Sequence, residues 1–402
     1  MEGPVWTAVS QAVGLMVTGL QLVPQRALDH RGVADAHLRS TEDNHLIHGD
    51  NKAALAALGD THTGRVRCAY IDPPFNTGID FEQYNDASTH AAWLTAFGDR
   101  VRLLRPLLSE EGSLWIHLDD TELHYAKVLL DGIFGRSNFV TSIVWQKVFA
   151  KKNKALVSVS HDTLLVYAKD IGAWRRNLLP RDESQLKAYK NPDSDPRGRW
   201  QSVSYSVTSE DGTRRRPYRY DIALPAGGTM GPPAGRHWNG RPERTAALRA
   251  DNRLWFGPKG DRRPRLKVFL SEVQPGIVPD TWWPYTVAGH NQEAKKEQRR
   301  LFADLEPFAT PKPERLLERI LRMATDPGDL VLDAYAGSGT TGAVAHKLGR
   351  RWIMVEQGDH CEQLVRARLV RVVDGDDPGG ITASAGWAGG GGFRYWTTGE
   401  PS

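Results

Sequence analysis

Cysteine and long apolar runs are scarce in this 402-residue sequence. The first scarcity argues against a disulfide-rich secreted protein, and the second argues against a membrane protein. Its two cysteines, Cys68 and Cys361, cannot form a disulfide framework, which favours a reducing cytoplasm over a secreted location. Both lie in apolar or helical runs, so covalent catalysis by cysteine is not indicated. The apolar stretch at residues 13–23 is far shorter than the roughly 20 residues that span a bilayer. No secretion signal is recognised either, so a membrane location is not expected.

Metal-ligand clusters and a strong overall charge are also missing. Thirteen histidines are scattered without metal-site spacing, so no metal is implied. The formal net charge is only +4, but it is unevenly distributed. Residues 171–270 contain 21 Lys and Arg against 10 Asp and Glu, a net charge of +11, so the rest of the chain carries −7. This regional excess favours nucleic acid as a partner of that part of the chain.

Residues 68–78 combine a short apolar strand with the rigid loop Asp72-Pro73-Pro74-Phe75. The two prolines remove two amide donors, so the Asp72 carboxylate and the Asp72 and Pro73 carbonyls become acceptors that no local amide can satisfy. Such acceptors beside the flat Phe75 ring suit a planar group that bears an amine, for example a nucleobase outside its stack. An Asp-Pro turn after a buried strand is the purely structural alternative.

A second predicted strand, residues 330–333, leads into a glycine-bearing turn and a helix from about Thr340 to Lys347. Glycine allows a ligand close to the backbone, and the free amides of a helix start favour a negative group. The next strand ends in Glu356, 19 residues after Gly337, where an acid is expected to bind ribose hydroxyls. Because Gly337, Gly339 and Gly342 complete a Gly-x-Gly-x-x-Gly pattern, nicotinamide or flavin binding stays open, as does a simple strand-to-helix turn.

Together these stretches resemble the beta arrangement of amino-group DNA methyltransferases, in which the Asp-Pro-Pro-aromatic motif precedes the glycine loop. Residues 47–51, residues 310–314 and Asn76-Thr77-Gly78 match the same family. The Asn-Thr-Gly extension and residues 143–147 are most similar to the modification subunits of Type III restriction systems and their solitary relatives. The resemblance covers about residues 41–372.

The resemblance implies S-adenosylmethionine as methyl donor and the exocyclic amine of adenine in duplex DNA as acceptor, reached by base flipping. Asp72 and the Pro73 carbonyl would accept the amine hydrogens while Phe75, supported by Pro74, stacks on the base. Asp50 would face the cofactor's adenine ring, besides capping a helix, and Thr310 and Lys312 would lie at the methionine end. The cofactor residues that the resemblance implies are Asp50, Thr310, Lys312, Asp333, Ala334, Gly337, Ser338, Gly339, Thr340 and Glu356.

Strands alternate with helices such as residues 91–105, where apolar side chains recur at helical spacing. This alternation predicts an α/β fold with a mainly parallel sheet and an antiparallel edge. The resemblance makes it a Rossmann-like, S-adenosylmethionine-dependent methyltransferase sheet with circularly permuted motif order. The expected parts are an N-terminal extension (1–40), a catalytic half (41–170), a target-recognition insertion (171–289), a cofactor-binding half (290–375) and a glycine-rich tail with a possible last strand (376–402).

The insertion carries basic clusters with interspersed tryptophans, which suit phosphate contacts and base stacking. Its candidate DNA-binding residues are Arg214, Arg215, Arg216, Arg262, Arg263, Arg265 and Lys267. Solvated charged loops are the alternative for either cluster taken alone. Besides double-stranded DNA, a homodimer and a restriction subunit are candidate partners by resemblance.

Two other functions stay open. Methylation of the cytosine exocyclic amine needs the same geometry, although Asp rather than Ser at position 72 favours adenine by resemblance. A non-catalytic, methyltransferase-like DNA-binding subunit should show damage in the Asp-Pro-Pro-Phe motif or the glycine loop, and both are intact. A nicotinamide oxidoreductase would leave the Asp72 loop without a role.

Overall fold

The computed structural model of the protein describes residues 22–24, 44–78, 80–81, 84–151, 155–208, 216–303 and 306–398. The chain divides into two compact units, Met1–Asn177 with Pro279–Ser402 and Leu178–Val278. The second unit lies within the predicted insertion at 171–289. Of the predicted N-terminal extension, the strand at 22–24 is described and the remainder lies outside the described residues.

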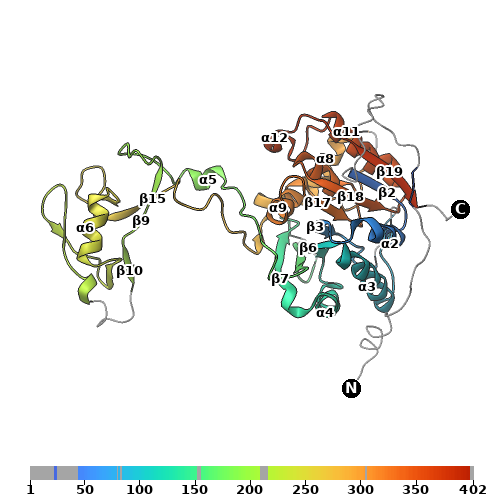
Figure 1. Ribbon diagram of the computed structural model, residues 1–402, viewed down its shortest axis with the longest axis horizontal. Coiled ribbons are helices and arrows are strands. Elements are labelled where there is room, and N and C mark those ends of the chain that lie inside the picture. The colour runs from blue at the N-terminus through green and yellow to red at the C-terminus, as the bar shows by residue number, and fades with distance from the viewer. Residues whose placement is uncertain are drawn as a thin grey trace, which may run out of the picture. The chain divides into compact units, whose positions relative to one another are not determined.

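A ten-stranded sheet organises the first unit (Figure 1). Its central strands pair in parallel, whereas antiparallel pairs and one short parallel strand complete the two ends. The prediction of an α/β fold with a mainly parallel sheet is therefore confirmed, and so is a last strand after the glycine-rich segment. In sheet order the strands are β1 (Leu22–Pro24), β19 (Phe393–Thr398), β2 (Asn44–His48), β18 (Arg351–Glu356), β17 (Leu330–Asp333), β3 (Val66–Ile71), β6 (Leu108–Leu118), β8 (His161–Ala168), β7 (Phe139–Gln146) and β16 (Trp282–Trp283).

The pairing of β3 with β17 brings the two predicted motifs together. These strands are adjacent and parallel, with Ala69 opposite Leu332. Their side chains are almost all buried, as expected for parallel strands covered on both faces. Because parallel strands end at the same edge, the loops after Ile71 and Asp333 meet where open α/β sheets bind ligands. The permuted chain order therefore leaves the two loops at one edge.

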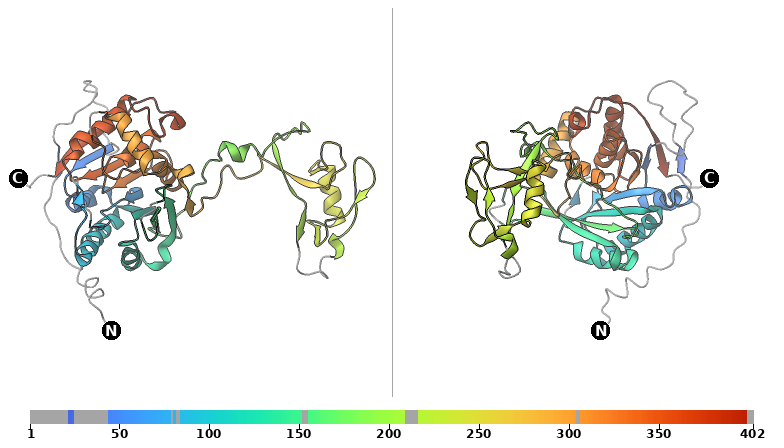
Figure 2. Two further views of the ribbon diagram at one scale, coloured as in Figure 1. Left: turned by 180° about the vertical axis from the view of Figure 1, so that it is seen from behind. Right: turned by 60° about the vertical axis from the view of Figure 1, so that its left-hand side comes forward.

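Helices cover both faces of this sheet, as Figures 1 and 2 show. The helices α2, α3 and α4 pack on one another along one face, and α9, α10 and α11 do so along the other. Their bounds are α2 (Asn51–His62), α3 (His90–Leu107), α4 (Leu123–Phe134), α9 (Glu314–Ala324), α10 (Thr340–Lys347) and α11 (Ala367–Asp374), which continues the π-helix η3 (Cys361–Arg366). The other elements of this unit are β4 (Asp80–Phe81), β5 (Tyr84–Asn85), η1 (Arg136–Asn138), α7 (Tyr285–Ala288), α8 (Asn291–Leu301) and α12 (Thr382–Ala385). Across the described ranges, no helix has the length and apolar character needed to cross a membrane.

Helix α3 illustrates how the sequence specifies these layers. The Thr89 side chain accepts a hydrogen bond from the Ala92 amide at 3.3 Å and caps the first turn. Trp93, Phe97 and Val101, which recur at helical spacing, are buried against the sheet core. The predicted crossover helix is therefore confirmed, and it extends slightly beyond residues 91–105 at both ends.

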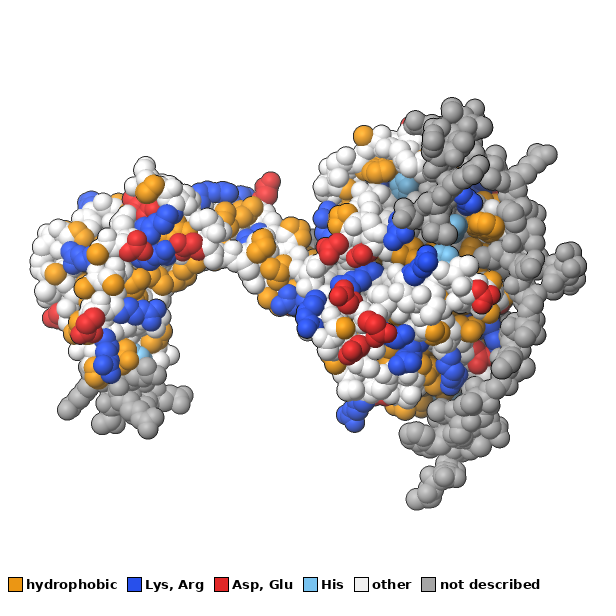
Figure 3. All heavy atoms as spheres, viewed as in Figure 1, with side chains coloured by type: hydrophobic (Ala, Val, Ile, Leu, Met, Phe, Trp, Pro, Cys, Tyr) orange, Lys and Arg blue, Asp and Glu red, His pale blue; other side chains and the backbone are white. Residues whose placement is uncertain are grey.

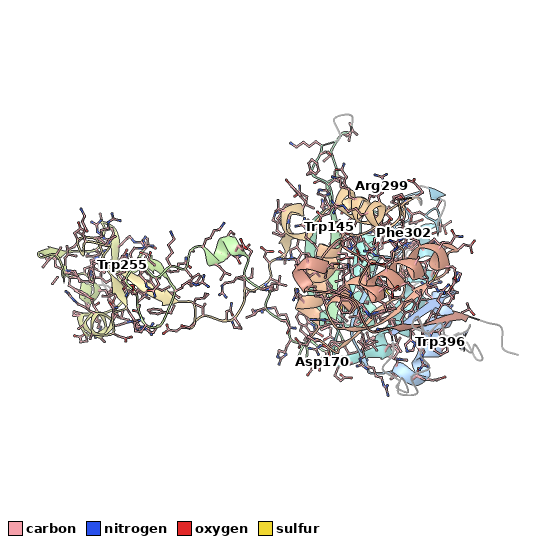
Figure 4. The ribbon with its side chains drawn as sticks, turned by 90° about the horizontal axis from the view of Figure 1, so that it is seen from above. Trp145, Asp170, Trp255, Arg299, Phe302 and Trp396 are labelled. Atoms are coloured by element: carbon pink, nitrogen blue, oxygen red, sulfur yellow. The ribbon has the colours of Figure 1, made fainter. Side chains whose placement is uncertain are left out.

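The second unit has its own small core, in which Tyr205, Trp238 and Phe256 are buried together. The rings of Trp255, labelled in Figure 4, and Trp200 lie 5.2 Å apart between their centroids. Short antiparallel strands and helix α6, whose Leu248 packs against the cluster, surround this core. Its elements are α5 (Glu183–Leu186), β9 (Trp200–Ser204), β10 (Ser206–Thr208), η2 (Arg216–Tyr218), β11 (Ile222–Ala223), β12 (Thr229–Met230), β13 (Arg236–Trp238), α6 (Pro242–Ala250), β14 (Leu254–Trp255) and β15 (Arg265–Phe269).

Candidate active site

A pocket with a volume of about 760 Å³ is formed by the segments that follow β2, β3, β17 and β18. This volume lies within the roughly 300–1,000 Å³ that is usual for small-molecule sites. Asp50 and Gly339 are not among the lining residues. The predicted site residues that line the pocket are Asp72, Pro73, Pro74, Phe75, Thr310, Lys312, Asp333, Ala334, Gly337, Ser338, Thr340 and Glu356.

The loop after β3 carries a carboxylate with one unpaired oxygen. Asp72 Oδ2 accepts a hydrogen bond from Lys312 Nζ at 2.5 Å. Asp72 Oδ1 is buried and has no hydrogen-bond partner among the described residues. A buried acceptor without a donor is costly, so Oδ1 is suited to receive a hydrogen from a ligand. Trp93 Nε1 donates to the Pro74 carbonyl at 2.6 Å and holds the loop from the side of α3.

A second carboxylate, that of Asp86, binds the segment that follows Phe75. Asp86 is buried, and its two oxygens accept the amides of Asn76 and Thr77 at 2.7 and 3.0 Å. The Thr77 hydroxyl donates to the same carboxylate. Asn76 adopts a positive φ of 62°, and its side-chain amide donates to buried Glu122 at 2.8 Å. The Asn-Thr-Gly extension noted in the sequence therefore forms a hydrogen-bonded clamp below the Asp72 loop.

The glycine loop after β17 is tied to the end of β18. The Gly337 amide donates to Glu356 Oε2 at 2.8 Å, and the Gly358 amide donates to Oε1 at 2.9 Å. Gly339 adopts a φ of 76° as it starts α10, and a Cβ there would come within 3.1 Å of Val365. A carboxylate can accept further hydrogen bonds, so Glu356 retains acceptor capacity for hydroxyl groups of a ligand.

Asp333 anchors the start of the glycine loop. Its carboxylate accepts the Thr341 hydroxyl at 2.6 Å and the Tyr335 amide at 2.9 Å. Burial raises the pKa of Asp333 to about 7, although these two hydrogen bonds act in the opposite direction. Asp333 thus organises the turn from within the sheet as well as lining the pocket.

A buried polar chain lies behind Phe75. The His117 ring stacks on Phe75 with centroids 5.9 Å apart, and its two nitrogens contact the Tyr70 hydroxyl at 3.0 Å and Asp162 Oδ2 at 3.2 Å. Burial alone would raise the pKa of Asp162, but the hydrogen bond and charge of His117 and Lys147 lower it. This hydrogen-bonded set of side chains therefore supports the Phe75 ring from the side of β6 and β8. Trp145, labelled in Figure 4, lies edge-on to His117, with 5.3 Å between the ring centroids, and packs beside these polar side chains.

Asp50 has the capping role that its position predicts. Asp50 Oδ1 accepts the Ala53 amide at 3.0 Å, and Oδ2 accepts Arg100 Nη2 at 3.1 Å. Arg100 and its partner Asn51 both line the pocket. Asp50 therefore contacts the pocket wall through Arg100.

The candidate DNA-binding residues of the second unit differ in exposure. Arg262, Arg263 and Arg265 are exposed. Arg214 and Arg215 lie outside the described residues, and the Arg216 side chain is not described either. In Figure 3, basic and acidic side chains are interspersed on the visible face of this unit, consistent with ion pairs such as Arg253–Glu272.

Lys267 does not lie on the surface of the second unit. It is predicted as a phosphate contact, but it is only 1% exposed and forms ion pairs with Asp193 and Asp195. A buried lysine whose ammonium is bound by two carboxylates does not present its charge to DNA, and the loss of either partner would leave a buried charge unpaired.

The residues that hold the Asp72 loop were not recognisable in the sequence. Helical spacing predicts Trp93 only as a core residue, although its indole nitrogen also binds the Pro74 carbonyl. No local pattern marks Asp86, and His117 is hidden within an apolar strand. These contacts join segments that are distant in sequence, so only the folded chain reveals them.

The fold and the pocket define an α/β protein with a permuted Rossmann-like sheet, in which an Asp-Pro-Pro-Phe loop and a glycine loop face one ligand site. The model of the DNA methylase family (N6_N4_Mtase) matches residues 66–366, well over half of the sequence. The chain therefore belongs to this DNA methylase family.

Two relatives illustrate the family. The Mod subunit of the Type III restriction-modification enzyme StyLTI of Salmonella typhimurium is 33% identical over 345 residues, which cover 78% of this chain and 51% of the relative. The Type II methyltransferase M.EcaI of Enterobacter cloacae is 29% identical over 334 residues, which cover 81% of this chain and 69% of the relative. The chain thus spans about half the length of the Type III Mod subunit that it matches.

Proposed function

We propose that the protein transfers a methyl group from S-adenosylmethionine to the exocyclic amine of adenine in duplex DNA. The observation that carries the proposal is Asp72 Oδ1, a buried acceptor without a partner among the described residues, in the pocket that the glycine loop also lines. An amine donor held there would lie beside the cofactor site. Membership of the DNA methylase family supports the same reading.

The pocket residues fit the proposed cofactor. The Glu356 carboxylate has the acceptor capacity that ribose hydroxyls require, and Gly337, with a φ of 53°, keeps the backbone open to a ligand. Phe308 and Val355 add apolar surface to the pocket. When bound, S-adenosylmethionine would supply an electrophilic methyl group on its sulfonium.

The residues around Asp72 would prepare the amine for transfer. An adenine amine is a poor nucleophile because its lone pair is delocalised into the ring. Asp72 Oδ1 and the Pro73 carbonyl would each accept one amine hydrogen, which raises the electron density on nitrogen. As the nitrogen–carbon bond forms and the sulfur–carbon bond breaks, Asp72 would take the proton that the amine releases. Placement and polarisation by fixed groups would supply the rate, with Phe75 stacked on the flipped base.

We also propose that residues 178–278 recognise the DNA sequence. The exposed Arg262, Arg263 and Arg265 support this assignment, together with the positive charge of the surrounding region. The similarity to the StyLTI Mod subunit makes a restriction subunit a candidate partner, and a homodimer is a second candidate assembly.

Nucleoside analysis tests the proposed reaction. The purified protein is incubated with isotopically labelled S-adenosylmethionine and a long DNA of mixed sequence, and the digested nucleosides are separated. Label in N6-methyladenine is expected, and it should disappear with Asp72→Ala. Label in N4-methylcytosine would instead establish the cytosine alternative. Absence of label from both nucleosides, with cofactor and DNA shown to bind, would favour a non-catalytic DNA-binding subunit.

A further inference from the structure

Family resemblance implies that Lys312 lies at the methionine end of the cofactor. In the structure, its ammonium binds the Asp72 carboxylate. We propose that Lys312 is a positioning residue for Asp72: its ammonium holds Oδ2 and leaves Oδ1 as the oxygen that receives the target amine. The inference rests on the proposed methyl transfer and deepens it, because it assigns different tasks to the two oxygens of one carboxylate.

Three contacts hold the Lys312 ammonium in place. Nζ lies 2.5 Å from Asp72 Oδ2, 3.4 Å from the Thr310 carbonyl oxygen and 5.4 Å from the centroid of the Phe75 ring. The side chain is only 8% exposed, so water competes little for these contacts. The ammonium therefore binds the carboxylate of Asp72 and lies over the ring of Phe75, the two groups that the target base would need.

The backbone around Lys312 restricts its freedom. Pro311 and Pro313 flank the residue, and each fixes its own φ near −65°. Pro313 is also the N-cap residue of α9, a helix with a buried face. The lysine side chain thus extends to Asp72 from a rigid support.

A fixed cation changes what the carboxylate can do. The terminal torsion of an aspartate is soft, so a carboxylate without a partner would sample many orientations of its two oxygens. Holding Oδ2 selects one orientation and keeps the other oxygen available as an acceptor. Such preorganisation lowers the reorganisation required in the transition state, and it should therefore affect kcat.

A Lys312 that lies at the methionine end of the cofactor, as resemblance implies, would affect the kinetics differently. If Lys312 bound the carboxylate of the cofactor's methionine part, its charge would contribute mainly to cofactor affinity. Replacing it would then weaken binding of S-adenosylmethionine and leave kcat at saturating cofactor nearly unchanged. The two tasks are therefore separated by measuring Kd and kcat for the same variants.

Lys312→Met removes the charge and keeps most of the side-chain length. We expect kcat for methyl transfer to fall about 10- to 100-fold while the Kd of S-adenosylmethionine stays within about threefold. Lys312→Arg retains the charge and should keep more activity than Lys312→Met. The matched control is Lys127→Met, which breaks a Lys127–Asp131 pair of 2.7 Å outside the pocket and should change neither quantity.

A double-mutant cycle shows whether Lys312 acts through Asp72. In an Asp72→Asn background measured under single-turnover conditions, Lys312→Met should cause less than a twofold further loss. A tenfold rise in Kd with unchanged kcat, or a full additional loss in the Asp72→Asn background, would overturn the inference.

The same cycle can be measured as shifts in Tm without DNA or cofactor. The Tm loss of the double variant should be smaller than the sum of the two single losses, and additive losses would also overturn the inference. If the wild-type protein transfers no methyl group, the proposed function fails, and this stability cycle still decides whether the pair holds Asp72.

Discussion

Removal of the Asp86 carboxylate should release the catalytic loop without removing the cofactor site. The buried Asp86 carboxylate accepts two backbone amides and one hydroxyl, and hydrogen bonds to a charged group contribute roughly 1.5–3 kcal/mol each. Counting only the two amides, Asp86→Ala should destabilise the ordered loop by about 3–6 kcal/mol. Since about 1.4 kcal/mol corresponds to a factor of ten, the equilibrium constant between the ordered and the open loop should fall by at least about 100-fold.

The consequence should be local. The loop can open without unfolding the sheet, so Tm should fall less than the local free energy implies. We expect kcat/KM for methyl transfer to fall by up to the same factor as this equilibrium constant. The affinity for S-adenosylmethionine should stay within about threefold, because Asp86 makes no hydrogen bond to Gly337 or Glu356 in the described part of the chain. Asp86→Asn keeps one acceptor and most of the shape, so its activity should be intermediate.

Amide hydrogen exchange at residues 76–78, measured together with methyl transfer, checks this reasoning. Protection of these amides should decrease in the order wild type, Asp86→Asn, Asp86→Ala. Glu111→Ala, which removes an exposed carboxylate paired with Arg67, serves as control and should leave both quantities unchanged. Unaltered protection together with wild-type turnover in Asp86→Ala would refute the clamp.

Three further predictions concern other parts of the chain. Glu356→Ala should weaken S-adenosylmethionine binding by roughly 1.5–3 kcal/mol in calorimetry, and unchanged affinity would remove Glu356 from the cofactor site. Burial raises the pKa of Glu297 from 4.5 to about 8, and the charge of Glu314 adds to the effect. Between these pH values the folded protein keeps a proton that the unfolded chain loses, so the stability of the folded state should decrease as pH rises. Glu297→Gln should flatten this decrease by up to about 1.4 kcal/mol per pH unit in denaturant titrations, and an identical slope would contradict the buried neutral acid. Changing Arg262 and Arg263 together to Ala should weaken binding to all duplexes and reduce the salt slope by up to about 0.9 per phosphate contact, whereas an unchanged slope would exclude phosphate contacts by these arginines.

The sheet and the meeting of the two loops were predictable because they depend on local patterns. Apolar runs that end in Asp72 and Asp333 predict buried strands, and glycines after Asp333 predict a turn into a helix. Parallel pairing then places both loops at one edge. Family resemblance supplied the permuted order that connects these patterns to one ligand site.

Side-chain partners distant in sequence were not predictable. Lys312 and Asp72 are 240 residues apart, and their ion pair follows from the packing of the segment before α9 against β3. Lys267 was predicted as a phosphate contact because its neighbours are basic, but it lies on the same face of β15 as buried Phe269, and its ammonium is paired with Asp193 and Asp195. A charge run alone does not distinguish a DNA-binding surface from one that contains a buried ion pair.

Methyl transfer by Asp72→Ala shows whether the Asp72 carboxylate acts in the transfer step. The variant is saturated with labelled S-adenosylmethionine and DNA, and a single turnover is followed in parallel with calorimetric titration of the cofactor. We expect near wild-type affinities for cofactor and DNA with a transfer rate reduced by several orders of magnitude, because the lost interaction acts mainly in the transition state. A transfer rate comparable to that of the wild type would contradict this role of the carboxylate.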